Sequence, residues 1–248
     1  MIFTGSYWYY GIIQFGLVAV EVLFAVFWVG RNKTFDRIAM WLIAAYLLCY
    51  KFDEYGPFFA IPLDLSAMSY FFFGMAAFVP FRPLKCAAGF SAVLSGAVYA
   101  FSMALFPENH ISSVSNGLSF FAINMALVNH NILIVGGLFM TAQARFERVD
   151  FVWLLGWFAF FFSYIMLVTE EFGVSVKNAS IMQILDGSLV ADAISVSRTP
   201  LFYVIYYTVV VAVSLTGVFL YARVNRAFNR FRRNPFLPDI IRVNPLFV

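Results

Sequence analysis

Seven long apolar stretches, separated by polar connections, run along the chain. They cover residues 8–30, 37–57, 61–80, 84–106, 118–142, 151–169 and 200–222. Apolar stretches of about 18 residues or more with few charges are typical of helices that cross a membrane. Nothing between the stretches is long enough for a separate soluble domain. The pattern therefore predicts an all-α polytopic membrane protein with a single transmembrane domain of seven helices.

The composition supports this prediction. Of the 248 residues, 62% are hydrophobic and only 12% are charged, whereas about a quarter of the residues of a soluble domain are charged. The net charge is +3, but the basic residues lie at the ends of the predicted helices rather than on one face. We therefore expect no nucleic-acid partner.

The distribution of basic residues predicts the orientation of the helices. Thirteen of the 16 Lys and Arg residues follow the first, third, fifth and seventh stretches. Basic residues concentrate in cytoplasmic connections, so we expect the N-terminus outside and the C-terminus in the cytoplasm. We expect the membrane to be the plasma membrane of a bacterium.

The first and last three stretches resemble each other. Residues 35–38, Phe-Asp-Arg-Ile, are similar to residues 146–149, Phe-Glu-Arg-Val, and each run leads to a tryptophan. Each following stretch ends in two acids, an aromatic residue and a glycine, at 53–56 and 170–173. These similarities predict a 3+1+3 parallel repeat, with the fourth stretch as the inverting linker. Repeats of this kind occur in transporters.

Two connections are candidate contact surfaces. The outer loop, residues 170–199, is long, and long loops are often functional. The cytoplasmic tail, residues 223–248, is basic, and such clusters next to a span bind anionic lipid headgroups. We assign this role to Arg226, Arg230, Arg232 and Arg233. Docking of protein partners on the loop and the tail is the alternative.

Glu21 and His130 are ionisable residues inside predicted spans. Counted from the outer ends of their spans, Glu21 lies ~20 Å deep and His130 ~18 Å deep, at 1.5 Å per residue. Ionisable groups at this depth indicate a functional site. A Glu21 carboxylate facing the imidazole would hold it in one tautomer, as a general base requires. The alternative is a structural hydrogen bond between spans 1 and 5.

Further polar residues extend this candidate site. Asn129 and Asn131 flank His130, and Asn124 lies seven residues before Asn131, on the same helical face. Near the outer end of the third span lie Asp64 and Ser66, and Lys51 lies at matching depth, as a predicted partner of Asp64. We assign Asn124, Asn129, Asn131, Asp64 and Lys51 as candidate substrate-binding residues.

Ser66 is a candidate nucleophile, and a serine nucleophile needs a base within hydrogen-bond reach. If both helices were straight, His130 would lie about 10 Å deeper in the membrane than Ser66. A kink, a tilt or a non-helical start of the third span is therefore required. Asp64 and Ser66 also point to different faces, because two residues on a helix are about 200° apart.

The sequence predicts no metal and no cofactor. Two histidines, His110 and His130, and two cysteines are spaced unsuitably for a zinc or bis-histidine haem site. The seventh span has no lysine for a retinal Schiff base, and no phosphate-binding glycine loop is present.

The run Ile-Pro-Leu-Asp-Leu-Ser at 61–66, followed by Val-Asn-His at 128–130, resembles the bacterial YwaF family. That family is related to eukaryotic transmembrane acyltransferases and androgen-induced lipid hydrolases. The resemblance extends over the seven-span layout and implies acyl chemistry on lipids, with His130 matching the span-5 histidine of the family. Two positions differ, because the family usually has histidine in place of Asp64 and cysteine in place of Ser66.

Three functions follow as hypotheses. The first is a lipid acyl hydrolase or acyltransferase in which Ser66 is acylated, His130 is the base and Glu21 orients it. The second is a small-solute transporter with a midplane site around Glu21 and His130. The third is a non-catalytic subunit of a larger membrane complex.

Overall fold

A computed structural model of the chain describes residues 7–55, 62, 64–108, 111, 120–172, 186–193 and 195–231. The helices found there are α1 (Trp8–Phe27), α2 (Lys33–Tyr55), α3 (Leu65–Phe78), α4 (Arg82–Leu105), α6 (Phe120–Gln143), α7 (Asp150–Phe172), α9 (Ser188–Ala193) and α10 (Pro200–Phe231). No strand occurs in these ranges, which confirms the all-α prediction.

Within the described ranges, five helices are long and apolar enough to cross a membrane. They are α1, α4, residues 124–143 of α6, residues 150–168 of α7 and residues 200–229 of α10. These helices indicate an α-helical membrane protein. The count of seven crossings, the 3+1+3 repeat and the orientation remain predictions.

The two remaining predicted spans form α2 and α3, which are not among these five helices. α2 carries charged residues near both ends, and its uncharged part covers only residues 38–50. α3 has 14 residues and is therefore ~21 Å long, whereas the hydrocarbon core of a bilayer is ~30 Å thick. α3 is also shorter than the predicted span, residues 61–80.

α10 is longer than predicted. The expected span ended at residue 222, but the helix continues through the basic residues to Phe231. Its 32 residues extend over ~48 Å. In the last turns Asn225 and Phe228 are buried against the other helices, while Arg223 and Arg226 are exposed. Packing of one side against the other helices keeps these turns helical, although the opposite side carries exposed basic residues.

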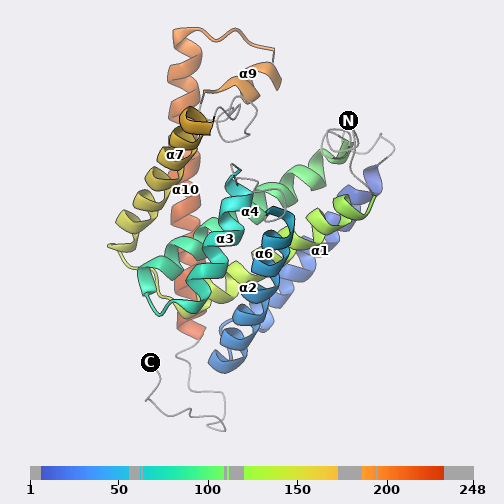
Figure 1. The fold of residues 1–248 in the computed structure, drawn as a ribbon, viewed down its shortest axis with the longest axis vertical. Helices are drawn as coiled ribbons and strands as arrows, with labels where there is room; N and C mark the ends of the chain where they lie inside the picture. The colour runs from blue at the N-terminus through green and yellow to red at the C-terminus, as the bar shows by residue number, and fades with distance from the viewer. Residues whose placement is uncertain are drawn as a thin grey trace.

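α4 and α6 form the closest helix pair, and small residues allow their approach (Figure 1). A Cβ atom built on Gly96 of α4 would lie 2.9 Å from the carbonyl oxygen of His130 in α6. A Cβ atom on Gly137 of α6 would lie 2.9 Å from a methyl carbon of Val93. Close backbone approach at small residues is how helices associate in membranes without a hydrophobic driving force between them.

The other helices surround this pair unequally. α1 packs on α4 and α6, α2 packs on α3 and α6, and α3 also packs on α4. α7 contacts α4, and α10 contacts α6, but both rise away from the bundle toward the upper left of Figure 1. Only 22% of the apolar part of α7 and 6% of that of α10 is buried. Both helices thus present most of their apolar surface to lipid or to another protein.

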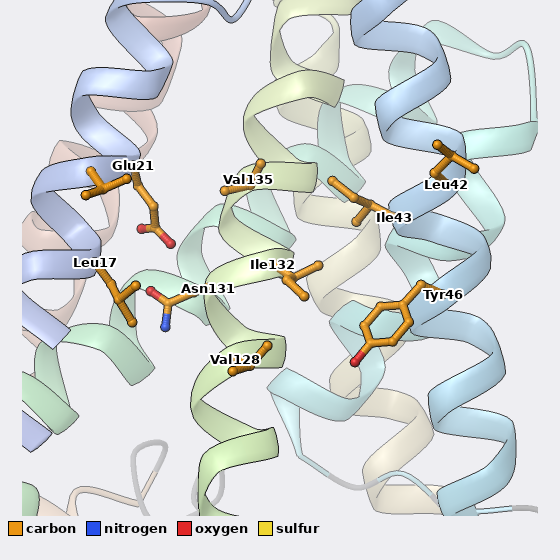
Figure 2. A pocket seen from close by; sticks show the side chains of 10 residues that line it. Leu17, Glu21, Leu42, Ile43, Tyr46, Val128, Asn131, Ile132 and Val135 are labelled. Atoms are coloured by element: carbon orange, nitrogen blue, oxygen red, sulfur yellow. The ribbon is translucent and has the colours of Figure 1, made fainter. Parts of the chain in front are cut away.

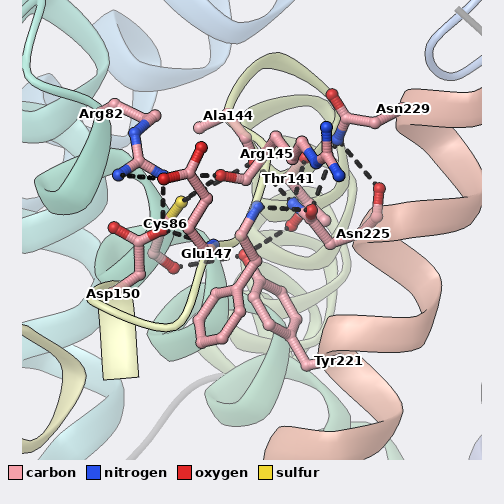
Figure 3. A network of polar contacts seen from close by, with 11 residues as sticks. Arg82, Cys86, Thr141, Ala144, Arg145, Glu147, Asp150, Tyr221, Asn225 and Asn229 are labelled. Carbon is pink, nitrogen blue, oxygen red and sulfur yellow. Dashed lines mark hydrogen bonds and ion pairs between the residues drawn. The ribbon is translucent and has the colours of Figure 1, made fainter. Parts of the chain in front are cut away.

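A polar network joins α4, α6, α7 and α10 at one end of the bundle (Figure 3). Asn225 of α10, which is fully buried, donates hydrogen bonds to the carbonyl oxygens of Thr141 and Ala144 at 2.8 and 2.6 Å. Its own oxygen accepts the Phe146 N–H at 2.7 Å. Carbonyl groups at a helix C-terminus have no partner within the helix, so Asn225 satisfies groups that burial would leave unpaired.

An ion pair completes this network. Arg82 contacts the buried carboxylate of Asp150 at 2.6 Å and donates to the carbonyl oxygen of Arg145 at 2.8 Å. Asp150 also accepts the Glu147 N–H at 2.7 Å. The connection between α6 and α7 is therefore held by side chains of α4, α7 and α10.

The turn between α1 and α2 requires a glycine. Gly30 has φ +84°, and a Cβ atom there would lie 3.3 Å from the carbonyl oxygen of Phe228. The Gly30 N–H donates to the buried carboxylate of Asp36 at 3.1 Å. Asn32 is the N-cap of α2, because its side-chain oxygen accepts hydrogen bonds from the N–H groups of Thr34 and Phe35. The turn thus contacts the end of α10.

Candidate functional site

The His130 imidazole lies between two tyrosines from different helices. It stacks on the Tyr99 ring of α4, with centroids 3.8 Å apart and planes 7° apart. The Tyr70 ring of α3 meets it edge-on, with centroids 5.5 Å apart. Aromatic contacts on two sides restrict the ring to one orientation. His130 is therefore held where α3, α4 and α6 meet.

A backbone carbonyl determines the tautomer of this ring. His130 Nδ1 lies 2.7 Å from the carbonyl oxygen of Ala126 in the preceding turn of α6. A carbonyl oxygen only accepts hydrogen bonds, so Nδ1 carries the proton and the neutral ring has its basic lone pair on Nε2. A backbone carbonyl commonly fixes a functional histidine in this way.

Ser66 lies on the same face of α3 as Tyr70, one helical turn nearer the start of the helix. It is half-buried. Four residues correspond to ~6 Å along the helix, so Ser66 lies one turn before Tyr70, the residue whose ring contacts His130. Much of the chain before Ser66, residues 56–61 and 63, lies outside the described ranges.

Lys51 is buried against the same aromatic group. Its ammonium nitrogen lies 4.7 Å from the centre of the Tyr70 ring and 5.3 Å from that of Tyr50. A cation over an aromatic face is stabilised, and more so when it is desolvated. Asp64, the predicted partner of Lys51, is exposed at the N-cap position of α3, where its side chain does not cap the helix. Lys51, Tyr70 and His130 thus connect α2, α3 and α6.

The three asparagines of α6 bind neighbouring helices. Asn131 exchanges two hydrogen bonds with Gln14 of α1, at 2.9 and 3.1 Å. Asn124 accepts a long hydrogen bond of 3.4 Å from Tyr10 of α1. Both therefore face α1, as their seven-residue spacing predicts. Asn129 accepts a 2.8 Å bond from the Tyr46 hydroxyl of α2.

Glu21 faces a side of α6 that does not carry His130. It lines a groove with Val128 and Ile132 of α6, among other residues. His130 is two residues after Val128 and so points about 200° away, toward α3 and α4. The structure does not bring Glu21 and His130 together, and Ala126 takes the orienting position assigned to Glu21.

The basic residues assigned to lipid headgroups are only partly within the described ranges. Arg226 is exposed near the end of α10 and donates to the Ala222 carbonyl oxygen at 3.1 Å. The backbone of Arg230 continues the helix. Arg232 and Arg233, like most of the outer loop, lie outside those ranges.

Sequence reasoning missed the partners of the polar residues in α6. Gln14 carried a signal, because it is an amide inside an apolar span, seven residues before Glu21. No such sequence signal marked Tyr46, Tyr70 and Tyr99, because tyrosines are frequent in this chain and near membrane interfaces.

Comparison with protein-family models, with curated proteins and with solved structures finds no match for this chain.

Proposed function

We propose that the protein hydrolyses or transfers the acyl groups of membrane lipids, with Ser66 as nucleophile and His130 as base. The observation that supports this most is the fixed His130 ring, with Nδ1–H on the Ala126 carbonyl and its faces and edge against two tyrosines. Such positioning leaves Nε2 as the basic nitrogen and is more than an imidazole needs merely to be tolerated in a membrane protein.

The position of Ser66 also supports the proposal. Ser66 and Tyr70 share a face of α3, and Tyr70 contacts His130. Ser66 is ~6 Å along α3 from Tyr70, and we expect a bridging water or a movement of the first turn of α3 to connect it to His130 when lipid binds. Catalytic hydrogen bonds often tighten only in the complex with substrate.

The reaction has two steps. Ser66 Oγ attacks the ester carbonyl carbon of the lipid, and its proton passes to His130 Nε2. The bond to the alcohol oxygen breaks, and the imidazolium returns the proton to this leaving oxygen. In the second step water or another lipid alcohol attacks the acyl-serine, loses its proton to Nε2, and releases the acyl product as Ser66 regains a proton.

The test is release of fatty acid from phospholipid carrying isotope-labelled acyl chains, with the purified protein in lipid nanodiscs. We expect Ser66→Ala and His130→Ala to abolish release. The matched control is Ser95→Ala, because Ser95 is a buried serine of α4 with no role in the proposed step. Equal release by the wild type and Ser66→Ala would disprove the serine mechanism.

A gain-of-reactivity variant gives an independent test. Ser66→Cys supplies a thiol, which is the better nucleophile near neutral pH. In a background with the exposed Cys49 replaced by serine, we expect Ser66→Cys to retain acyl release and to become sensitive to alkylation. We expect His130→Ala to slow the alkylation of this cysteine. Full activity after complete alkylation would show that position 66 is not in the active site.

A further inference from the structure

A groove of about 520 Å³ lies between α1 and α2, with α6 as its floor (Figure 2). Its size is within the ~300–1,000 Å³ range of small-molecule sites. The lining is almost entirely aliphatic. Among the described lining residues, only Glu21, Asn131 and Tyr46 have polar side chains.

Two of these three polar side chains already have hydrogen-bond partners. The Asn131 amide is bonded to Gln14 and to the Leu127 carbonyl oxygen. The Tyr46 hydroxyl donates to Asn129. These bonds hold the helices together and use both N–H donors of Asn131 and the hydroxyl proton of Tyr46.

Glu21 is different. Its side chain is directed from α1 toward α6, and the residue is only 8% exposed. Oxygen Oε1 has no hydrogen-bond partner among the residues that the structure describes, and no basic side chain lines the groove. A buried carboxyl oxygen without a partner is costly, more so at membrane depth. A ligand that donates a hydrogen bond would remove this cost.

The entrance of the groove is apolar, as expected for an opening toward hydrocarbon. Its rim carries Val20 of α1 and Leu42 of α2, which are 61% and 67% exposed, and α1 is one of the helices long and apolar enough to cross a membrane. A ligand reaches Glu21 from within the bilayer, with its apolar part against the aliphatic lining.

We propose that this groove binds a single-chain amphiphile whose hydrogen-bond donor, a hydroxyl or an ammonium group, contacts the Glu21 carboxyl. The site is separate from His130, since the two lie on opposite sides of α6. Binding there does not depend on acyl chemistry at Ser66.

The test uses three C16 probes that carry a diazirine in the chain and end in an ammonium, a hydroxyl or a methyl ester. The methyl ester accepts hydrogen bonds but donates none. The full-length protein in nanodiscs is irradiated with each probe, and labelled peptides are quantified by mass spectrometry. The protein contains an internal control, a second apolar groove of about 450 Å³ between α3, α4 and α7, lined by residues such as Phe72 and Trp157 and by no carboxyl group.

We expect the two donor probes to label the α1–α2–α6 groove about tenfold more than the methyl ester does, as a hydrogen bond to a charged or buried group implies. We expect equal labelling by all three in the α3–α4–α7 groove. Glu21→Gln cannot ionise but keeps an acceptor, so it should reduce ammonium labelling more than hydroxyl labelling. A hydroxyl ligand is indicated if Glu21→Gln leaves the hydroxyl probe bound.

Two variants separate this proposal from other outcomes. Leu42→Trp fills the groove and should abolish labelling there, whereas Leu215→Trp, on the exposed face of α10, should not. Ser66→Ala should label like the wild type, so failure of the acyl mechanism leaves this result unaffected. Equal labelling of both grooves by all probes, unchanged in Glu21→Gln, would mean that ordinary lipid chains fill the groove and would overturn the proposal.

Discussion

The substitution Gly96→Ala tests the close packing of α4 on α6. The new Cβ atom would lie 2.3 Å from Cγ1 of Ile134 and 2.9 Å from the His130 carbonyl oxygen. Ile134 is itself buried, and the carbonyl belongs to the α6 backbone, so neither neighbour can move without separating the helices. Overpacking of this kind costs about 1–3 kcal/mol.

The matched control is Gly217→Ala in α10, where a Cβ atom would meet nothing within 4 Å. Both variants gain the same helix propensity, ~1 kcal/mol, so their difference isolates the packing cost. We therefore expect Gly96→Ala to be about 1–3 kcal/mol less stable than Gly217→Ala. The assay is reversible unfolding by sodium dodecyl sulfate in mixed micelles, followed by tryptophan fluorescence. Equal stability of the two variants would refute the close approach of α4 and α6 at Gly96.

Two further predictions concern the polar ends of the helices. Asn225→Leu leaves two carbonyl groups and the Phe146 N–H without their partner, so the same titration should show a loss of about 3 kcal/mol; a loss no larger than that of Asn229→Leu would contradict the network. The Ser188 hydroxyl and N–H donate to Asp186 in the connection before α10 and lower the pKa of that carboxyl. A lowered pKa stabilises the folded form above the unfolded pKa, and this contribution disappears as the pH falls through the folded value. The Ser188 amide signal in NMR should therefore titrate below the ordinary aspartate range, and titration at or above that range would contradict the contact.

Apolar runs were sufficient to predict the long helices, because hydrocarbon requires continuous helical hydrogen bonding. They did not predict the end of α10. Charges at Arg223 and Arg226 led to the prediction that the helix ends near residue 222, but a helix continues past charged residues when one side still packs. Buried Asn225 and Phe228 provide that packing.

The candidate site shows a second limit of sequence reasoning. Counting residues estimates depth, and it placed Glu21 and His130 at similar depth. It does not determine which neighbour each helical face meets. Val128 and Ile132 line the same groove as Glu21, whereas His130 contacts Tyr70 and Tyr99. The spacing of Asn124 and Asn131 did predict a shared face, because that inference stays within one helix.

The close contact between α4 and α6 could be predicted from the sequence only in part. Gly89 and Gly96 are seven residues apart and share a face of α4, a pattern that favours close helix contact. Other glycines, such as Gly16 and Gly156, have open space around them. Sequence spacing alone does not separate these two groups, because the partner helix is what distinguishes them.

The most direct test of acyl chemistry is the intact mass of the purified protein after incubation with phospholipid and rapid acid quenching. The proposed mechanism predicts a mass gain of one acyl group in the wild type, located on Ser66 by peptide sequencing and absent in Ser66→Ala. His130→Ala should form this adduct far more slowly. An adduct of the same size in Ser66→Ala, or no adduct and no released fatty acid in the wild type, would contradict the mechanism.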